Sequence, residues 1–319
     1  MKLSDYKNKK VLVTGGGGFL GANLVRELIN YQAKVNLFLR SSTKPWRLSD
    51  VINKVKVYQV DLNKKKKVEQ AVRKIKPQII FHLAAYGCYP FQTDINQIIK
   101  TNIQGTVNLL EALNHLNYQS FVNTGTSSEY GYKNKPVKET DLLEPTSFYA
   151  VSKATATHFC QVFSKEFNKP IVTLRPFSIY GDWEEPSRFI PTIITSCLKN
   201  KTIKLVPGKQ VRDFLYVKDL TRAFLLVGLK NNLGGEIINI GSGKQYLIKE
   251  TAEKIIQLIG NKVKVKIGAY KPRKWDTDFW VADIKKAKKL LNWKPKYNLK
   301  QGLKKSIEWY KMNLKLYAK

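Results

Sequence analysis

The sequence predicts an α/β protein built on a doubly wound parallel sheet, with a smaller C-terminal lobe. Three observations lead to this fold class. Short apolar runs alternate with longer amphipathic stretches, a glycine-rich turn joins the first run to the first stretch, and the rhythm becomes shorter and proline-punctuated after residue 181. Repeated β–α alternation is typical of parallel sheets covered by helices. We expect a main domain over 1–180, with returning segments near 212–240, and the lobe mainly over 181–319.

Each apolar run has the length of a buried strand, and each amphipathic stretch has the period of a helix. The predicted strands are residues 10–14, 34–39, 55–60, 78–83, 120–124, 171–174, 211–217 and 236–240. The predicted helices are residues 19–31, 97–116 and 147–167, with a mostly helical tail from 248 that closes with 299–314.

The composition is that of an ordinary globular protein, with 43% hydrophobic and 11% aromatic residues among 319. No apolar run approaches about 18 residues, and the polar N-terminus does not resemble a signal peptide, so we expect neither a membrane partner nor secretion. Cys88, Cys160 and Cys197 are too scattered for a disulfide framework, and we expect no metal site. These features favour a cytoplasmic protein.

The formal net charge of +32 is unusual, and only nine of the 56 basic residues are arginine. Lysine is spread along the whole chain, which is typical of a solvated surface with a compositional bias. The alternative is an electrostatic field that attracts anionic ligands such as nucleotides. Because the sequence contains no recognisable nucleic-acid-binding module, we do not expect a nucleic-acid partner.

A glycine-rich turn follows the first predicted strand and leads directly into a helix. Gly15, Gly18 and Gly21 form a G-x-x-G-x-x-G pattern, with Phe19 and Leu20 at the start of the helix. Glycine allows the tight turn, the close approach of a pyrophosphate and close helix–strand packing. Free N–H groups at the helix N-terminus then face the phosphates. This context predicts a binding site for a nicotinamide dinucleotide over these residues.

The end of the second predicted strand selects between NAD and NADP. An acidic residue at this point would bind the ribose hydroxyls, but the chain has Arg40 followed by Ser41. The Arg40 guanidinium favours a 2′-phosphate, so NADP (NADPH) is favoured and NAD remains possible. Asp61, at the end of the third predicted strand, is a candidate acceptor for the adenine amino group.

Tyr149 and Lys153 form a Y-x-x-x-K pair that a helix places on one face. A free tyrosine has a pKa of about 10. A neighbouring ammonium favours the phenolate and lowers this pKa, so the pair suits proton transfer at neutral pH. Thr126 follows the strand at 120–124, at the sheet edge where parallel sheets place ligands. We therefore expect Thr126, Tyr149 and Lys153 to be the catalytic residues, with the Thr126 hydroxyl bonding the reacting oxygen.

Together these motifs resemble the extended short-chain dehydrogenase/reductase family, the nucleotide-sugar epimerases, dehydratases and reductases. The likeness covers nearly the whole chain and includes the segments 14–21, 61–62, 82–85, 130–131, 174–176, 180–181 and 212–219. It implies a Rossmann fold, a Ser/Thr–Tyr–Lys triad, and usually a homodimer through the helices near 97–116 and 147–167. It also implies cofactor contacts at Leu62, Leu83, Ala84, Ala85, Asn102, Thr124 and Pro176.

Within that family, 4,6-dehydratases carry acidic residues directly after the triad threonine. Ser127 and Ser128 stand at those positions, and Glu129 comes one place late, so dehydration is disfavoured. Arg40 favours an NADPH-dependent reductase of a keto-sugar, and the segments 183–191 and 275–283 resemble the CDP-abequose and CDP-paratose synthase branch. The alternative is an NAD-dependent nucleotide-sugar epimerase. A non-catalytic regulator or RNA-binding protein is a distant alternative, because it would lack the Tyr–Lys pair.

Several residues are candidates for binding a nucleoside-diphosphate sugar. Arg212 and Arg273 resemble the diphosphate clamp of the family, and scarce arginines at these places suit a phosphate. Tyr86 and Cys88 follow the fourth predicted strand, where they would line a sugar pocket, with Cys88 as a wall rather than a nucleophile. The remaining candidates are Thr126, Ser127, Ser178 and Arg188.

Overall fold

The computed structural model describes residues 2–205, 209–261, 263–268 and 277–317. The chain forms two compact units. The first consists of Met1–Gly131, Glu139–Pro176 and Thr221–Asn239, and the second of Tyr132–Lys138, Phe177–Leu220 and Ile240–Lys319. Within the described parts of the chain, no helix combines the length and the apolar character needed to cross a membrane.

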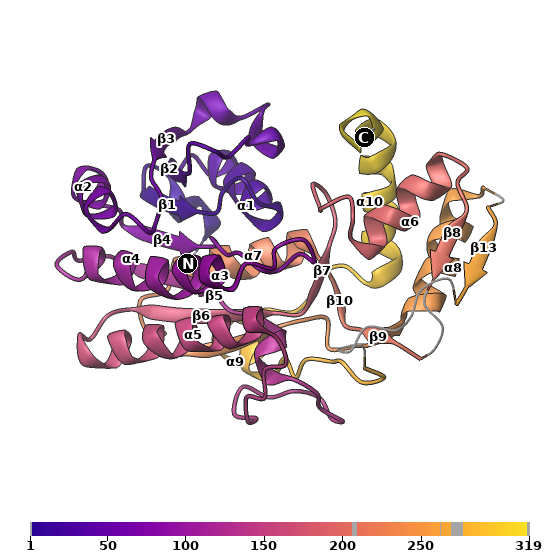
Figure 1. Cartoon of the computed structure of the whole chain (residues 1–319). Coiled ribbons are helices and arrows are strands. Elements are labelled where there is room, and N and C mark those ends of the chain that lie inside the picture. Colours follow the sequence, from indigo (N-terminus) through magenta and orange to yellow (C-terminus); the bar gives the residue numbers. More distant parts are fainter. Residues whose placement is uncertain (1, 206–208, 262, 269–276, 318–319) are drawn as a thin grey trace. The chain divides into compact units, whose positions relative to one another are not determined.

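A seven-stranded sheet forms the centre of the first unit (Figure 1). Its strands are β1 (Lys10–Thr14), β2 (Lys34–Leu39), β3 (Lys56–Gln59), β4 (Ile79–His82), β5 (Ser120–Thr124), β6 (Ile171–Pro176) and β11 (Ile237–Ile240). They lie in the order β11-β6-β5-β4-β1-β2-β3, and the pairs from β6 to β3 are all parallel. The order reverses between β1 and β4, the point at which open parallel sheets bind ligands. The prediction of a doubly wound parallel sheet is therefore confirmed.

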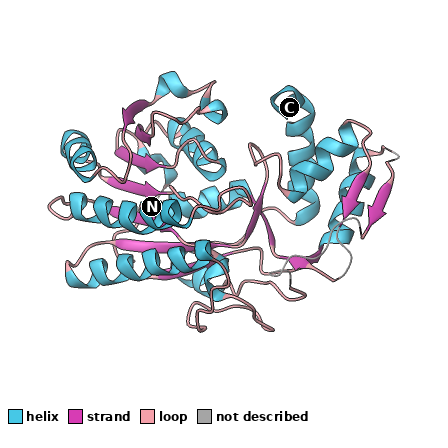
Figure 2. Ribbon diagram, viewed as in Figure 1, coloured by secondary structure: helices cyan, strands magenta, loops and turns pink. Residues whose placement is uncertain are grey.

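Helices cover this sheet on both faces, as Figure 2 shows. They are α1 (Phe19–Asn30), α2 (Lys65–Ile75), α3 (Ile95–Ile99), α4 (Gly105–Leu113), α5 (Phe148–Glu166) and α7 (Val217–Gly228). Side chains alternate between the faces of a strand. Accordingly, Ile80 of β4 belongs to the core cluster that includes residues of α2, α4 and α5. The adjacent Phe81 packs instead on Phe224 of α7, with ring centroids 6.3 Å apart.

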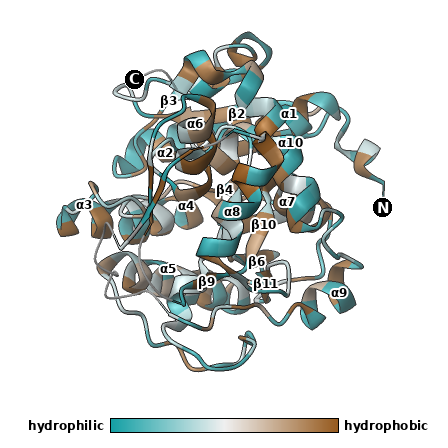
Figure 3. Cartoon of the chain, turned by 90° about the vertical axis from the view of Figure 1, so that its right-hand side faces the viewer, coloured by the Kyte–Doolittle hydropathy of each residue, from teal (hydrophilic) through white to brown (hydrophobic). Residues whose placement is uncertain are grey.

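The second unit contains short strand pairs and helices. Its strands are β7 (Ser178–Tyr180), β8 (Ile203–Leu205), β9 (Val211–Arg212), β10 (Phe214–Tyr216), β12 (Tyr246–Leu247) and β13 (Val265–Ile267), and its helices are α6 (Phe189–Leu198), α8 (Ile248–Ile259), α9 (Lys285–Leu291) and α10 (Leu299–Met312). β7 pairs with β10, β9 with β12 and β8 with β13. Hydrophobic and hydrophilic residues alternate along α10 (Figure 3), as expected of a helix with one buried face. The Asp219 carboxylate accepts the Lys296 and Tyr297 N–H groups at 2.8 and 3.0 Å, which fixes the start of this last helical segment.

Two predicted elements differ from the structure. The single helix predicted over 97–116 is instead α3, a π-helical turn over Lys100–Gln104 and α4. The strand predicted over 211–217 is split into β9 and β10, because Asp213 lies between them and accepts the N–H groups of Ser242, Gly243 and Ala282. The sequence analysis also did not identify α2, whose lysine-rich first turn follows directly on Lys64.

Candidate active site

The glycine-rich turn between β1 and α1 is built so that only glycine fits at two of its positions. Gly15 has a positive φ of 70°, and a Cβ there would lie 2.6 Å from the Ala84 nitrogen. A Cβ on Gly21 would meet the Gly16 Cα at 2.6 Å. Gly18 is the N-cap of α1, and its N–H donates to the Gly15 carbonyl at 3.0 Å. Phe19 and Leu20 open the helix, so their N–H groups belong to its free N-terminus.

The segment that follows β4 lies directly against this turn. Leu83 donates its N–H to the Thr14 carbonyl at 3.1 Å, and Ala84 donates to the Thr14 hydroxyl at 3.3 Å. Leu83, Ala84 and Ala85 are half-buried. The turn and this segment therefore lie side by side at the switch point of the sheet. The free N–H groups of a helix N-terminus at such a place suit the pyrophosphate of a dinucleotide.

Arg40 and Ser41 follow β2 and are exposed. Their turn lies beside the glycine-rich turn, since a Cβ on Gly17 would meet the side chains of Thr43 and Leu39 at 3.5 and 3.7 Å. Asp61 is half-buried, and its carboxylate accepts the Asn63 N–H at 2.9 Å. This hydrogen bond uses one carboxylate oxygen of Asp61 and fixes the orientation of the other. Contacts of these residues with adenosine remain predictions.

A chain of buried polar groups runs from β1 to the catalytic helix. His82 contacts the Thr14 hydroxyl through Nδ1 at 2.8 Å and the Thr106 hydroxyl through Nε2 at 2.9 Å. Complete burial, with the nearby Lys153 charge as a second cause, lowers the pKa of His82 to about 3. His82 is therefore a neutral, buried bridge between β1 and α4.

The chain continues through Asn102 in the π-helical turn. Its amide accepts the Tyr86 N–H at 2.8 Å and donates at 2.8 Å both to the Tyr86 carbonyl and to the Ser152 hydroxyl. Ser152 in turn donates to the Tyr149 carbonyl at 2.8 Å. These bonds use both amide hydrogens of Asn102, which is fully buried. Asn102 thus acts on the site through Tyr86 and Ser152, and its predicted direct contact with the cofactor remains a prediction.

Tyr149 and Lys153 lie near the beginning of α5, which the Ser147 hydroxyl caps by accepting the Ala150 N–H at 3.2 Å. Lys153 is only 1% exposed, so it is not an ordinary solvated lysine on the surface of a helix. Burial lowers the pKa of Lys153, and the Glu129 carboxylate opposes that shift. An ammonium so placed in a low-dielectric interior acts strongly on a phenol one helical turn away.

Thr126 follows β5 and opens a short 3-10 helix over Ser127–Tyr130. Its hydroxyl oxygen accepts the Ser128 N–H at 3.2 Å, which keeps the hydroxyl hydrogen for a different acceptor. Thr124 and Pro176 end the paired strands β5 and β6 at the same edge, and Ser127 is buried. The Thr124 hydroxyl is buried without a partner among the described residues, so it can still bond a ligand.

The sequence analysis missed the role of Glu129. From the sequence, Glu129 was noted only as a carboxylate one position beyond the two that are acidic in 4,6-dehydratases. In the structure Glu129 is completely buried and paired with Arg175. The pattern contained one signal of this pairing, since Arg175 lies near the end of β6, the strand paired with β5. Recognising that Glu129 pairs with Arg175 required the register between the parallel strands β5 and β6.

The predicted substrate residues lie in different parts of the structure. Tyr86 and Cys88 belong to the loop after β4, where the Gln92 side chain accepts the N–H groups of Gly87 and Tyr89 at 3.0 and 3.3 Å. A Cβ on Gly87 would lie 3.4 Å from the Tyr149 Cβ, so this loop lies against the catalytic helix.

The other candidates belong to the second unit. Ser178 lies in β7, Arg188 is the half-buried N-cap of α6, and Arg212 ends β9, where its guanidinium donates to the Val211 carbonyl at 2.7 Å. Arg273 lies outside the described residues. Their contacts with a substrate remain predictions.

The fold and the glycine-rich turn define the class of dinucleotide-binding α/β enzymes, and the roles of Thr126, Tyr149 and Lys153 remain predictions. Residues 11–241 match the NAD dependent epimerase/dehydratase family, and the chain belongs to that family. The predicted membership in the extended short-chain dehydrogenase/reductases is confirmed, as is the expectation of an NAD(P)-dependent enzyme.

Individual relatives agree over nearly the whole chain. A UDP-glucuronate 4-epimerase of Thermodesulfobacterium geofontis is 32% identical, over 96% of this chain and 97% of the relative. A human dTDP-D-glucose 4,6-dehydratase is 31% identical, over 96% and 91%. The solved UDP-glucuronic acid 4-epimerase of Bacillus cereus, in complex with UDP-glucuronic acid and NAD, is 29% identical with a TM-score of 0.83, over 95% of this chain and 99% of that one.

Proposed function

We propose that the protein catalyses the NAD-dependent 4-epimerisation of a nucleoside-diphosphate sugar. The observation that supports this proposal most directly is the buried Lys153 one helical turn after Tyr149, with Thr126 opening the neighbouring loop. Such a centre suits reversible proton transfer at a sugar hydroxyl. Relatives described as UDP-sugar 4-epimerases, and a neighbour solved with NAD, support epimerisation better than the reductase that the sequence analysis placed first.

Relatives also include 4,6-dehydratases. The loop after β5 supports a different reaction for this chain. Elimination of water needs an acid and a base that reach the sugar. Glu129 is 0% exposed and bound to Arg175, and Ser127 and Ser128 occupy the two positions after Thr126. A hydroxyl group is too weak an acid and base for that step at neutral pH. The arrangement therefore favours epimerisation over dehydration.

The residues of the glycine-rich turn fit the dinucleotide. Added Cβ atoms at Gly15 and Gly21 would collide with backbone, so glycine at these two positions allows the tight turn and the close packing of α1 that a dinucleotide-binding turn requires. Gly15, Gly18, Phe19, Leu20 and Gly21 would hold the phosphates at the N-terminus of α1. The bound cofactor supplies the acceptor and donor of the hydride.

The residues of the centre then have distinct roles. Tyr149 takes the proton of the sugar hydroxyl and later returns it, and the Thr126 hydroxyl donates a hydrogen bond to the same oxygen. Lys153 supplies the positive charge that favours the phenolate. Because Lys153 is buried, water screens that charge little, and its effect on Tyr149 is large.

The chain retains one feature that favours the second candidate, an NADPH-dependent reductase of a keto-sugar nucleotide. Arg40 is exposed in the turn that lies against Gly17, the place where a guanidinium can pair with a 2′-phosphate. We therefore keep NADP as the alternative cofactor.

One assay separates these candidates. The purified protein is incubated with UDP-glucose, UDP-glucuronate or UDP-N-acetylglucosamine and NAD, and separately with a CDP-4-keto-6-deoxy sugar and NADPH. An epimerase converts a UDP-sugar into its 4-epimer without net change in nicotinamide absorbance. A stoichiometric loss of NADPH, with no epimer formed, would refute epimerisation in favour of the reductase. Mass spectrometry of any co-purified dinucleotide identifies the cofactor independently.

A homodimer is the second part of the proposal. Apolar side chains on α3 and α5 are exposed in the single chain, with Phe148 62%, Val151 47%, Phe159 39%, Val162 58% and Ile99 47% exposed. On α5 these positions follow a helical spacing and form one stripe. An exposed apolar stripe of this kind favours burial against a second copy. The stripe lies on α5, one of the two helices through which the family resemblance implies a dimer.

A further inference from the structure

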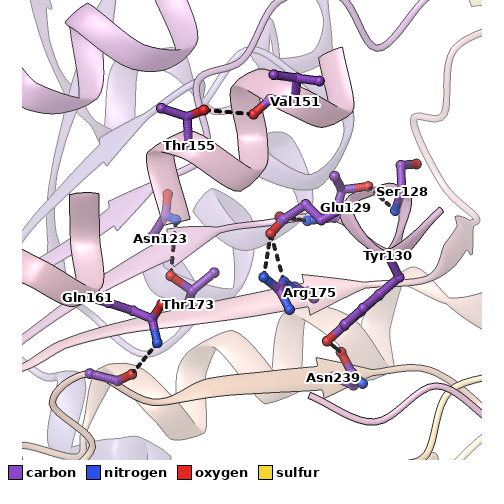
Figure 4. A network of polar contacts seen from close by, with 12 residues as sticks. Asn123, Ser128, Glu129, Tyr130, Val151, Thr155, Gln161, Thr173, Arg175 and Asn239 are labelled. Atoms are coloured by element: carbon purple, nitrogen blue, oxygen red, sulfur yellow. Dashed lines mark hydrogen bonds and ion pairs between the residues drawn. The ribbon is translucent and has the colours of Figure 1, made fainter. Parts of the chain in front are cut away.

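A fully buried ion pair lies behind the loop that carries Thr126 (Figure 4). The Glu129 side chain is 0% exposed and the Arg175 side chain 1%. One carboxylate oxygen of Glu129 accepts the Arg175 Nε–H at 2.8 Å and lies 2.7 Å from Nη2 as an ion-pair contact. Burying two charges is costly unless geometry and further hydrogen bonds compensate, and a hydrophobic pair is often equally stable. The pair therefore needs an explanation beyond stability.

The second carboxylate oxygen of Glu129 bonds the loop itself. It accepts the Thr126 N–H at 2.8 Å, which closes a capping box over the 3-10 helix. The glycine before Thr126 makes this closure possible, because a Cβ on Gly125 would lie 2.7 Å from that oxygen and 2.9 Å from the Arg175 Cγ. Glu129 thus bridges two elements, joining the Thr126 backbone to the strand β6 that carries Arg175.

Arg175 is held in turn by its surroundings. Its guanidinium lies 4.6 Å from the centre of the Tyr130 ring, and the Tyr130 hydroxyl donates to Asn239 of β11 at 2.7 Å. Two neighbouring strands of the sheet therefore anchor the loop through side chains. Such an anchor limits the positions that the Thr126 hydroxyl can take.

The same carboxylate lies close enough to Lys153 to affect its charge. Among the causes that shift the pKa of Lys153, burial lowers it and Glu129 is the first of those that raise it. The other titratable groups that act on Lys153 are Cys160 and Cys88, and Lys153 in turn acts on His82. Burial raises the pKa of the Cys160 thiol to about 12 and lowers that of the His82 ring to about 3.

We propose that Glu129, held by Arg175, is a positioning residue of the active site that fixes Thr126 through its backbone N–H. This inference rests on the proposed function, since that function gives Thr126 its role. It goes beyond that function because neither Glu129 nor Arg175 touches the substrate.

Two variants separate the two effects of the carboxylate. Glu129→Asp keeps the charge, but its side chain is one methylene shorter and cannot reach both Arg175 and the Thr126 N–H. The double variant Glu129→Gln/Arg175→Gln removes both charges and keeps an amide oxygen that can accept the Thr126 N–H. A matched control is Lys65→Gln/Glu111→Gln, which removes the exposed ion pair between α2 and α4. Each protein is compared with wild type for kcat as a function of pH and for the Kd of NAD.

We expect Glu129→Asp to lower kcat by about 10- to 100-fold, because small misplacements of a catalytic group have effects of this size. The alkaline limb of its kcat profile should stay at the wild-type pH. The double variant should retain more activity than Glu129→Asp, because its amide oxygen can still accept the Thr126 N–H. The control variant should match wild type, and the Kd of NAD should change little throughout.

Two results would overturn the proposal: a kcat for Glu129→Asp within about twofold of wild type, or a double variant that loses as much kcat as Glu129→Asp. If Glu129→Asp does not fold, the double variant still tests the positioning, because it removes both charges of the buried pair together and keeps an acceptor for the Thr126 N–H. Amide hydrogen exchange at Thr126 gives a readout that does not depend on turnover. If amide exchange at Thr126 is unchanged in Glu129→Asp, the positioning by Glu129 is refuted, whether or not the wild type is active. An inactive wild type would refute the proposed function separately.

Discussion

Tyr149 is the residue on which the proposed chemistry depends. Tyr149→Phe keeps the ring and removes the hydroxyl that transfers the proton. We expect kcat to fall by about 10²- to 10⁴-fold, the usual contribution of general acid–base catalysis, while the Kd of NAD is retained. Steady-state kinetics with the active nucleotide sugar and a fluorescence titration with NAD measure the two quantities. Tyr132→Phe, at a tyrosine that is 43% exposed, is the control. A Tyr149→Phe enzyme with wild-type kcat would exclude Tyr149 as the acid–base.

His82 gives the chain a specific sensitivity to acid. Its pKa is lowered from 6.5 to about 3 in the folded protein, so folding favours the neutral ring. The stabilisation from this preference is complete above pH ~6.5 and is lost as the pH falls towards 3, by up to about 1.4 kcal/mol per unit. The free energy of unfolding of wild type minus that of His82→Gln should therefore decrease as the pH is lowered from 7 to 5.

Urea unfolding at a series of pH values measures this difference. His115→Gln, at an exposed histidine, serves as the control. A difference between wild type and His82→Gln that stays constant from pH 7 to 5 would mean that His82 titrates normally in the folded state.

At the scale of elements, the turn between β1 and α1 offers a matched pair of glycines. Gly21→Ala places a Cβ 2.6 Å from the Gly16 Cα, and because that neighbour is backbone, α1 must move away from β1. In Gly17→Ala the new Cβ meets only side chains, at 3.5 Å or more. We expect the Kd of NAD to rise more than tenfold in Gly21→Ala, by about 1.4 kcal/mol or more, and to change far less in Gly17→Ala. Isothermal titration calorimetry with NAD would show whether the two variants instead behave alike.

The predictions from sequence succeeded where a local pattern is sufficient. The period of the apolar residues located β1, β2, β4, β5 and β6 to within two residues, and the glycine spacing located the turn before α1. They failed where a distant contact decides the local structure. Nothing near Asp213 in the sequence indicates that Ser242, Gly243 and Ala282 will donate to its carboxylate and split the predicted strand.

The same reasoning applies to the site. Tyr149 and Lys153 are four residues apart, so helix geometry alone predicts that they share a face. Glu129 and Arg175 are 46 residues apart and meet only because β5 and β6 are neighbours in the sheet. A sequence shows which residues carry charge, but parallel pairing decides which charges meet. This is why Glu129 was recognised as a carboxylate and its partner was not.

At the scale of the whole molecule, a formal net charge of +32 bears on association rather than on fold. Lysine spread along the whole chain is typical of a solvated surface. If the protein binds the proposed nucleotide sugar, the same lysines would create a positive field that attracts its diphosphate. Inside the first unit, by contrast, Arg175 forms a buried ion pair with Glu129.

The state of assembly is the last property that the chain's surface predicts. Val151 and Phe159 lie two turns apart on the exposed stripe of α5, and both would be buried by a second copy. We expect Val151→Glu/Phe159→Glu to convert a dimer into a monomer, because two carboxylates at the centre of an interface lose their water without gaining partners. Light scattering after size exclusion measures the mass. Leu142→Glu, at a side chain that is 74% exposed outside these helices, should remain dimeric. A monomeric wild type would refute the proposed dimer, and a dimeric double variant would place its interface elsewhere.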